Sequence, residues 1–254
     1  MKTQLMIAFT ALSLAACQQQ REARHMVENY PDARRDETVV DEYFGLKVAD
    51  PYRWLENDTS DETAAWVEAQ RALTADYLSH ITFRTKLKGR LTALTNYPRT
   101  GCPYKRGERW FVSKNDGLQN QNVIYMFEGD DITADAPLKV VLDPNTLSDD
   151  GTVALAGFDI SKDGRYLAYA IARNGSDWNE IYVKDLETMQ MLDDHIEWAK
   201  FGGPSWHGEG FYYSAYATPT DAHAYSGKNE NHRVYLHRLG TQQSEDVIAY
   251  ENPA

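Results

Sequence analysis

Apolar residues recur at steps of three and four along residues 59–94, which is the period of an amphipathic helix. The first stripe comprises Trp66, Ala69, Leu73, Tyr77 and Ile81, and the second comprises Phe83, Leu87, Leu91 and Leu94. Thr59 and Glu62 have the spacing of a capping box, which predicts a helix start ahead of the first stripe. Residues 96–103, NYPRTGCP, contain two prolines and a glycine and predict the end of the helical region.

Short β-rich runs follow and form a repeat. Residues 104–113, 161–170 and 206–215 each combine a polar turn containing glycine with an aromatic-rich strand, and residues 122–127, 180–186 and 233–239 supply a second strand. Trp110, Tyr166 and Phe211 mark the first strand at spacings of 56 and 45 residues; Tyr125, Tyr182 and Tyr235 mark the second at 57 and 53. Repeated β units of this period are typical of propeller blades.

The remaining runs predict the other strands of each blade. Residues 138–142 predict an outer strand, residues 157–161 and 199–206 predict inner strands, and residues 246–251 predict a last strand with an unpaired edge. A β-sandwich is the alternative, but three matched strand pairs favour the propeller. The expected fold is therefore mainly β with an N-terminal α segment, and about three blades form an incomplete propeller because closed rings have four or more.

The first residues have the pattern of an export signal. Lys2 precedes an apolar run from Leu5 to Ala16, which is too short to span a bilayer, and Leu14-Ala15-Ala16-Cys17 resembles a bacterial lipobox. We expect residues 1–17 to be a lipoprotein signal, Cys17 to carry lipid, and residues 18–28 to form a tether. The chain would then be exported and held at a bacterial membrane through this anchor. The alternative is an ordinary signal peptide in which Cys17 is incidental.

Composition narrows the classes of partner. Only Cys102 remains besides Cys17, so an internal disulfide is not expected once Cys17 carries lipid. The chain has 26 basic and 38 acidic residues, a net charge of −12, and no basic run of five. Nucleic acid is therefore not an expected partner, since its phosphates are bound by clustered lysine and arginine.

Catalytic and cofactor motifs are not found in the sequence. The nearest approach to a nucleophile elbow is GPSWH at residues 203–207, which lacks the second glycine and places Pro204 and Trp206 beside Ser205. Ser205 and His207 have no built-in third partner. The seven histidines lack zinc-site spacing and no phosphate-binding loop occurs, so no catalytic residue, metal site or cofactor is predicted. The acid pairs Asp130-Asp131 and Asp149-Asp150 are predicted to be turn residues.

Residues 30–57, YPDARRDETVVDEYFGLKVADPYRWLEN, resemble the N-terminal segment of the prolyl oligopeptidase family, serine peptidases that cleave short peptides after proline. The resemblance continues through residues 66–70, 115–127, 142–155, 174–183 and 237–247. It implies that residues 29–100 pack on an α/β-hydrolase domain encoded further downstream, and that residues 101–254 are the first blades of a seven-bladed propeller. The family's catalytic serine, aspartate and histidine would lie downstream too, so the chain alone is expected to be inactive.

The resemblance also implies one substrate contact. AKFGGPSW, residues 199–206, resembles the family segment whose phenylalanine lines the substrate pocket, which corresponds to Phe201. Residues 202–204 depart from the common form, and the alternative for Phe201 is a strand core residue. Asp177 matches an aspartate that pairs with a downstream arginine; without that partner it is a turn acid. The alternative function for the whole chain is a free-standing propeller-type binding module.

Overall fold

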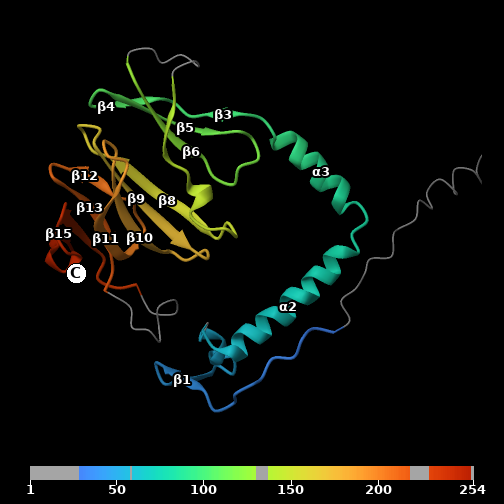
Figure 1. Cartoon of the computed structure of the whole chain (residues 1–254). Helices are drawn as coiled ribbons and strands as arrows, with labels where there is room; N and C mark the ends of the chain where they lie inside the picture. Colours follow the sequence, from blue (N-terminus) through green and yellow to red (C-terminus); the bar gives the residue numbers. More distant parts are fainter. Residues whose placement is uncertain (1–28, 58, 130–136, 218–228, 253–254) are drawn as a thin grey trace, which may run out of the picture. The chain divides into compact units, whose positions relative to one another are not determined.

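The computed structural model describes residues 29–57, 59–129, 137–217 and 229–252 (Figure 1). The chain divides into two compact units, Met1–Lys88 and Gly89–Ala254. The boundary falls within a helix, α3, that spans Arg84–Thr95. The predicted division at residues 100 and 101 is a statement about whole family members and stays a prediction.

The first unit begins with a small hairpin. Strands β1 (Val40–Tyr43) and β2 (Leu46–Ala49) pair antiparallel. Phe44 and Gly45 connect them with φ of 52° and 82°, the two positive values of a type I′ turn that matches the twist of a hairpin. A short 3-10 helix, η1 (Arg53–Glu56), and helix α2 (Asp61–Ser79) follow.

Polar contacts hold the segment around η1 in place. Arg53 Nε donates to Asp50 Oδ2 at 2.6 Å, and a second nitrogen of the same guanidinium donates to Asp41. Trp54 Nε1 donates to the carbonyl oxygen of Arg34 at 2.8 Å, and the Arg34 guanidinium lies over the Trp54 ring. The aromatic segment ADPYRWLEN is therefore pinned to neighbouring parts of its own unit.

Helix α2 begins one residue later than the sequence predicts. Its N-cap is Ser60, whose Oγ accepts a hydrogen bond from Thr63 N at 3.2 Å. The Thr59 hydroxyl instead donates to Asn57 Oδ1 at 3.0 Å, so the prediction that Thr59 caps the helix is wrong. Adjacent threonine and serine are both good caps, and the local turn decides between them.

Most of the first predicted stripe lies on α2 and most of the second lies on α3, whereas Ile81 and Phe83 lie in the connection between the two helices. Trp66 and Leu73 of the first stripe are half-buried, whereas Phe83, Leu87, Leu91 and Leu94 of the second stripe are 49–60% exposed. Among the described residues, no helix is long and apolar enough to cross a membrane.

The described strands of the second unit form a five-stranded and an eight-stranded antiparallel sheet. The first sheet is one blade, and the second holds two blades that are joined by the residue pair Ala199–Ala215. The first blade comprises β3 (Arg99–Thr100), β4 (Tyr104–Arg106), β5 (Arg109–Asn115), β6 (Val123–Glu128) and β7 (Lys139–Leu142). The second comprises β8 (Val153–Ile160), β9 (Tyr166–Arg173), β10 (Trp178–Asp185) and β11 (Met191–Lys200). The third comprises β12 (Ser205–His207), β13 (Gly210–Ala215), β14 (Arg233–Arg238) and β15 (Val247–Glu251) (Figure 1).

The predicted strand pairs are confirmed in all three blades. A stacked aromatic pair joins the two middle strands each time: Trp110 with Phe127, Tyr169 with Tyr182, and Tyr213 with Tyr235. Such cross-strand pairs stabilise a sheet at the point where side chains of one face meet. The aromatic repeat therefore marks the two central strands of each blade, although Tyr125, Tyr166 and Phe211 of the repeat lie beside these stacked pairs and not in them.

Residues 199–206 are not the single inner strand that the sequence predicts. Ala199 and Lys200 end β11, residues 201–204 form a connection, and β12 begins at Ser205. Phe201 has a φ of 56°, which leaves the extended region, and Pro204 has no N–H to donate to a ladder. One segment therefore links two blades rather than forming one strand.

The blades pack face to face through two apolar cores. Alternate residues of β9 point to opposite faces, so Leu167, Tyr169 and Ile171 join a core with the first blade, whereas Ala168 and Ala170 join a core with the third.

Two turns of neighbouring blades also meet through their backbones. Gly107 N donates to Lys162 O at 2.9 Å, and a Cβ on Gly164 would lie 2.4 Å from Arg106 O. Glycine is required there because two turns approach with their backbones in contact.

The last strand has the exposed edge that the sequence predicts. All five residues of β15 are exposed, and three of them, Val247, Ile248 and Tyr250, are large and apolar. Among the described strands, β15 pairs with β14 on one side.

Candidate substrate-contact site

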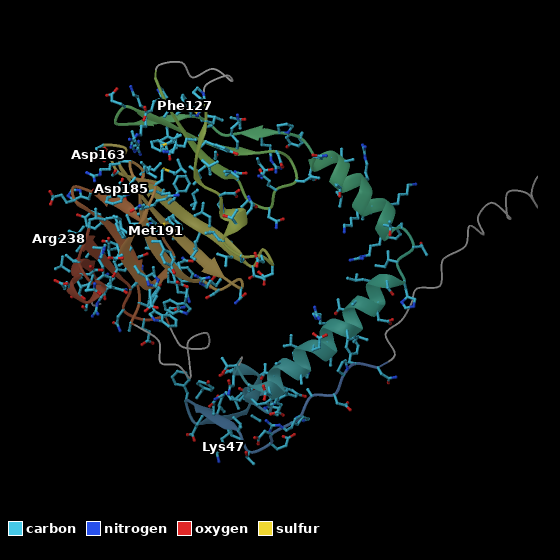
Figure 2. The ribbon with its side chains drawn as sticks, in the orientation of Figure 1. Lys47, Phe127, Asp163, Asp185, Met191 and Arg238 are labelled. Carbon is cyan, nitrogen blue, oxygen red and sulfur yellow. The ribbon has the colours of Figure 1, made fainter. Side chains whose placement is uncertain are left out.

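Four stretches of the second unit meet at the end of the blades where β11 finishes. Trp178, the first residue of β10, pairs with Lys200, the last residue of β11. Asp177 and Phe201 are the next residues outward, so they lie at the same end. Ala215 of β13 pairs with Arg233 of β14, close to Ala199, which brings Tyr216 to this end too. Figure 2 labels Asp185, Met191 and Arg238, which mark the other end of these strands.

Phe201 is an exposed aromatic side chain on a constrained backbone. It is 61% exposed, and its φ of 56° lies in the left-handed region that disfavours a side chain. Its ring meets Tyr216 edge-on with centroids 6.1 Å apart. Phe201 is therefore outside the strands and outside the core, which contradicts the alternative of a strand core residue. Its role in substrate contact stays a prediction.

Beside Phe201 lies a buried lysine. Lys200 is 8% exposed, and its Nζ lies 4.3 Å from the Trp178 ring centroid and 5.1 Å from the Phe201 ring centroid. The same Nζ donates to Asn229 Oδ1 at 3.1 Å. Trp198 meets Trp178 edge-on at 5.5 Å. We call Trp178, Trp198, Lys200, Phe201 and Tyr216 the Lys200 cluster.

The glycines after Phe201 allow close packing between blades. A Cβ on Gly202 would lie 2.7 Å from Ser214 Oγ, the hydroxyl that donates to Lys200 O at 2.9 Å. A Cβ on Gly157 of β8 would lie 3.2 Å from the Cα of Gly203. The departure of residues 202–204 from bulkier residues therefore lets the connection lie against β8 and β13.

The other residues singled out by the sequence lie as follows. Asp177 is exposed in a bend, and Cys17 and the pair Asp130-Asp131 lie outside the described residues. Asp150 Oδ1 accepts from the N and Oγ1 of Thr152 at 3.0 and 2.7 Å, which confirms its role as a turn residue. Cys102 is a free, exposed thiol.

The Ser205-His207 pair does not form a nucleophile elbow. Both residues are exposed on the short strand β12, and the His207 ring contacts Tyr212. Across the described parts of the chain, no group of three or more His, Cys, Asp or Glu side chains is arranged to hold a metal ion.

The spacing of the histidines in the sequence does not indicate that one of them, in the third blade, is buried. The His237 side chain is fully buried; its Nδ1 lies 2.8 Å from Asp246 Oδ1 and its Nε2 lies 3.0 Å from Asp194 Oδ1. Tyr213 donates to Asp246 Oδ2 at 2.8 Å, and Gly240 N donates to Asp194 Oδ1 at 2.6 Å. Because carboxylate oxygens only accept, both ring nitrogens carry protons and His237 is an imidazolium. In the structure, His237 pairs with Phe211, a residue of the aromatic repeat. Its place opposite that residue was the signal that could have indicated a buried histidine.

The charges of this group follow from its surroundings. Burial lowers the pKa of His237, but the hydrogen bonds and charges of Asp194 and Asp246 outweigh it and raise the pKa to about 9. Burial raises the pKa of Asp194, but His237 and the Gly240 N–H hold that pKa below its usual range. His237 lies toward the opposite end of β14 from the Lys200 cluster, so we assign it to the fold rather than to the candidate site.

Comparisons with known proteins agree with this architecture. The family model described as "Prolyl oligopeptidase, N-terminal beta-propeller domain" matches residues 31–254. A prolyl endopeptidase of Elizabethkingia meningoseptica is 42% identical over 245 residues, which cover 96% of this chain and 34% of that protein. Prolyl oligopeptidase A of Amanita bisporigera is 33% identical over 250 residues, which cover 88% and 33%.

Solved structures give the same result. Prolyl oligopeptidase B of Galerina marginata, bound to a 35mer hydrolysis and macrocyclization substrate, is 30% identical with a TM-score of 0.70, and the match covers 89% of this chain and 34% of that one. The chain thus spans about a third of the length of the relatives that it matches. It belongs to the prolyl oligopeptidase family, and it carries part of that family's N-terminal β-propeller.

Proposed function

We propose that this chain is the N-terminal part of a serine peptidase that cleaves short peptides after proline. The observation that carries the proposal is the family match over residues 31–254, together with relatives named prolyl endopeptidase at 42% identity. Since the chain covers about a third of such a relative, the nucleophile, its histidine and its aspartate would come from an α/β-hydrolase part that the chain does not contain.

The chemistry would be acyl transfer. A serine that gives its proton to histidine attacks the carbonyl carbon of proline, and preorganised donors stabilise the oxyanion. The bond from this carbon to the next residue's nitrogen breaks, the amine leaves with the proton from histidine, and water then hydrolyses the acyl-serine. The blades would restrict access so that short peptides reach the nucleophile. Phe201 would line the substrate pocket, which is supported by its exposure at a rim where four chain stretches converge.

Hydrolysis of a proline-linked chromogenic peptide tests this proposal. We expect residues 18–254 alone to release no chromophore, because the catalytic groups are absent. We expect the product of the same reading frame, continued past Ala254 through a glycine-flanked serine elbow, to release it. Turnover by residues 18–254 would contradict the proposal. A natural stop codon directly after Ala254 would contradict it too and favour the free-standing binding module.

We also propose that the protein is exported and anchored through a lipid on Cys17. The support is the order Lys2, apolar run and Leu14-Ala15-Ala16-Cys17 in the sequence. Expression in a bacterium with radiolabelled palmitate should label the wild-type chain and leave Cys17→Ser unlabelled and unanchored. Cys102→Ser is the matched control and should stay labelled; label on Cys17→Ser would refute the anchor.

A further inference from the structure

The side chain that could hold Phe201 in position is the neighbouring lysine. We propose that Lys200 is a positioning residue that sets the orientation of the Phe201 ring and thereby the affinity for peptide substrate. This inference rests on the proposed function for its effect on substrate and on the geometry of the Lys200 cluster for its cause.

The first step is the buried ammonium. Removing a charged group from water is unfavourable unless its new contacts compensate, and Lys200 is 8% exposed. Its Nζ is stabilised by the faces of Trp178 and Phe201 and by Asn229 Oδ1. A cation over an aromatic ring is attracted to it, and the attraction grows as the pair is shielded from solvent; here the ammonium is buried and the Phe201 ring is partly shielded. The ammonium and the Phe201 ring therefore hold each other.

The second step is the backbone of Phe201. A positive φ in a residue with a side chain is unfavourable and persists where the surroundings impose it. With 61% of Phe201 exposed, the core does not impose it. Its ring meets Tyr216 edge-on and lies 5.1 Å from the Lys200 ammonium. Loss of the ammonium therefore removes a main restraint on an exposed ring.

The third step is the position of the lysine between two blades. Trp178 belongs to β10 of the second blade, whereas Asn229 precedes β14 of the third. The Lys200 carbonyl also accepts from Ser214 at the end of β13. Lys200 thus contacts the second and the third blade and the Phe201 ring. These contacts fix the orientation of the ring relative to both blades, as a side chain that lines a pocket requires.

Steady-state kinetics of the continued reading frame, with a proline-linked chromogenic peptide, tests the effect on substrate. For Lys200→Met, which keeps the apolar stem and removes the charge, we expect KM to rise about fivefold with kcat within about twofold, as for the loss of one partly shielded cation–aromatic contact. Lys200→Arg should restore most of the affinity. Lys200→Met added to Phe201→Ala should raise KM no further than Phe201→Ala alone, because the lysine acts through that ring.

Lys184→Met is the matched control. Lys184 lies on β10 of the same blade, is partly buried, and donates through Nζ to Val141 O at 2.9 Å. Its replacement removes the same charge away from the Lys200 cluster, so KM should be unchanged. Equal changes of KM in the two lysine variants, or an unchanged KM in a folded Lys200→Met protein, would overturn the inference.

A readout without activity separates this inference from the proposed function. With 4-fluorophenylalanine at Phe201 of the present chain, the fluorine resonance should be shifted from its unfolded-chain value in the wild type and in Lys184→Met. It should move toward that value in Lys200→Met. An inactive long product with this shift intact would refute the proposed function alone, whereas identical fluorine spectra for Lys200→Met and wild type would refute the positioning role.

Discussion

Replacement of His237 by leucine is expected to lower the free energy of unfolding of the blade unit by about 3–5 kcal/mol, the range for breaking a buried ion pair from one side. The variant removes a cation that two buried carboxylates share, at 2.8 and 3.0 Å. Asp194 and Asp246 then remain without their charged partner in a site where their side chains are 4% and 2% exposed. Added apolar packing does not offset two uncompensated charges.

Denaturant unfolding followed by near-ultraviolet circular dichroism checks this expectation. His207→Leu is the matched control, because His207 is exposed on β12 of the same blade, and it should change stability by less than about 0.5 kcal/mol. Adding Asp194→Asn and Asp246→Asn to His237→Leu should recover part of the loss, since the buried charges are then removed. A His237→Leu protein as stable as the control would show that the ion pairs do not hold the third blade.

Stability of the wild-type chain is expected to fall on the alkaline side of neutrality. In the unfolded chain His237 loses its proton near its ordinary pKa of 6.5, whereas in the fold its pKa is raised to about 9. The imidazolium therefore contributes fully below pH 6.5, and the contribution declines as pH rises and is gone once the folded-state pKa of about 9 has been passed. The difference in pKa corresponds to about 3 kcal/mol.

At acidic pH the contribution of Asp194 to stability changes with pH in the opposite direction. The pKa of Asp194 is lowered in the fold, so its contribution is present above the ordinary pKa of 3.8 and is lost as pH falls through the lowered value. Unfolding curves between pH 4 and 10 should show the alkaline decline in the wild type and in His207→Leu. The decline should be about 3 kcal/mol smaller in His237→Leu. Equal alkaline slopes in all three proteins would exclude His237 as the titrating group.

The strand pairs of the blades could be predicted from the sequence because their signals are local. A polar turn with glycine followed by aromatic residues recurs at Trp110, Tyr166 and Phe211, and each unit forms a hairpin of neighbouring strands. Alternation along a strand determines which side chains enter the core. The three-blade prediction depends on this local pattern, whereas the family resemblance depends on longer stretches such as residues 30–57.

The boundaries of helices and strands were harder to predict where the local sequence permits two structures. Thr59 and Ser60 are both acceptable helix caps, and the position of Asn57 decides in favour of Ser60. Residues 199–206 have the composition of a strand, but the positive φ of Phe201 and the close approach of Gly203 to Gly157 divide them. The first outcome depends on a side chain two residues from Thr59, whereas the second depends on a neighbour from another strand.

The kind of fold, the number of blades and the exposed last edge follow from the order of residues alone, since hydrophobic alternation and turn residues act over a few positions. The charged contacts of His237 and Lys200 do not. Asp246 lies nine residues from His237, but Asp194 lies 43 residues away, and Asn229 lies 29 from Lys200. The sequence does not indicate these two distant partners. Only packing of the second blade against the third brings these groups together and removes the water that would otherwise weaken their attraction.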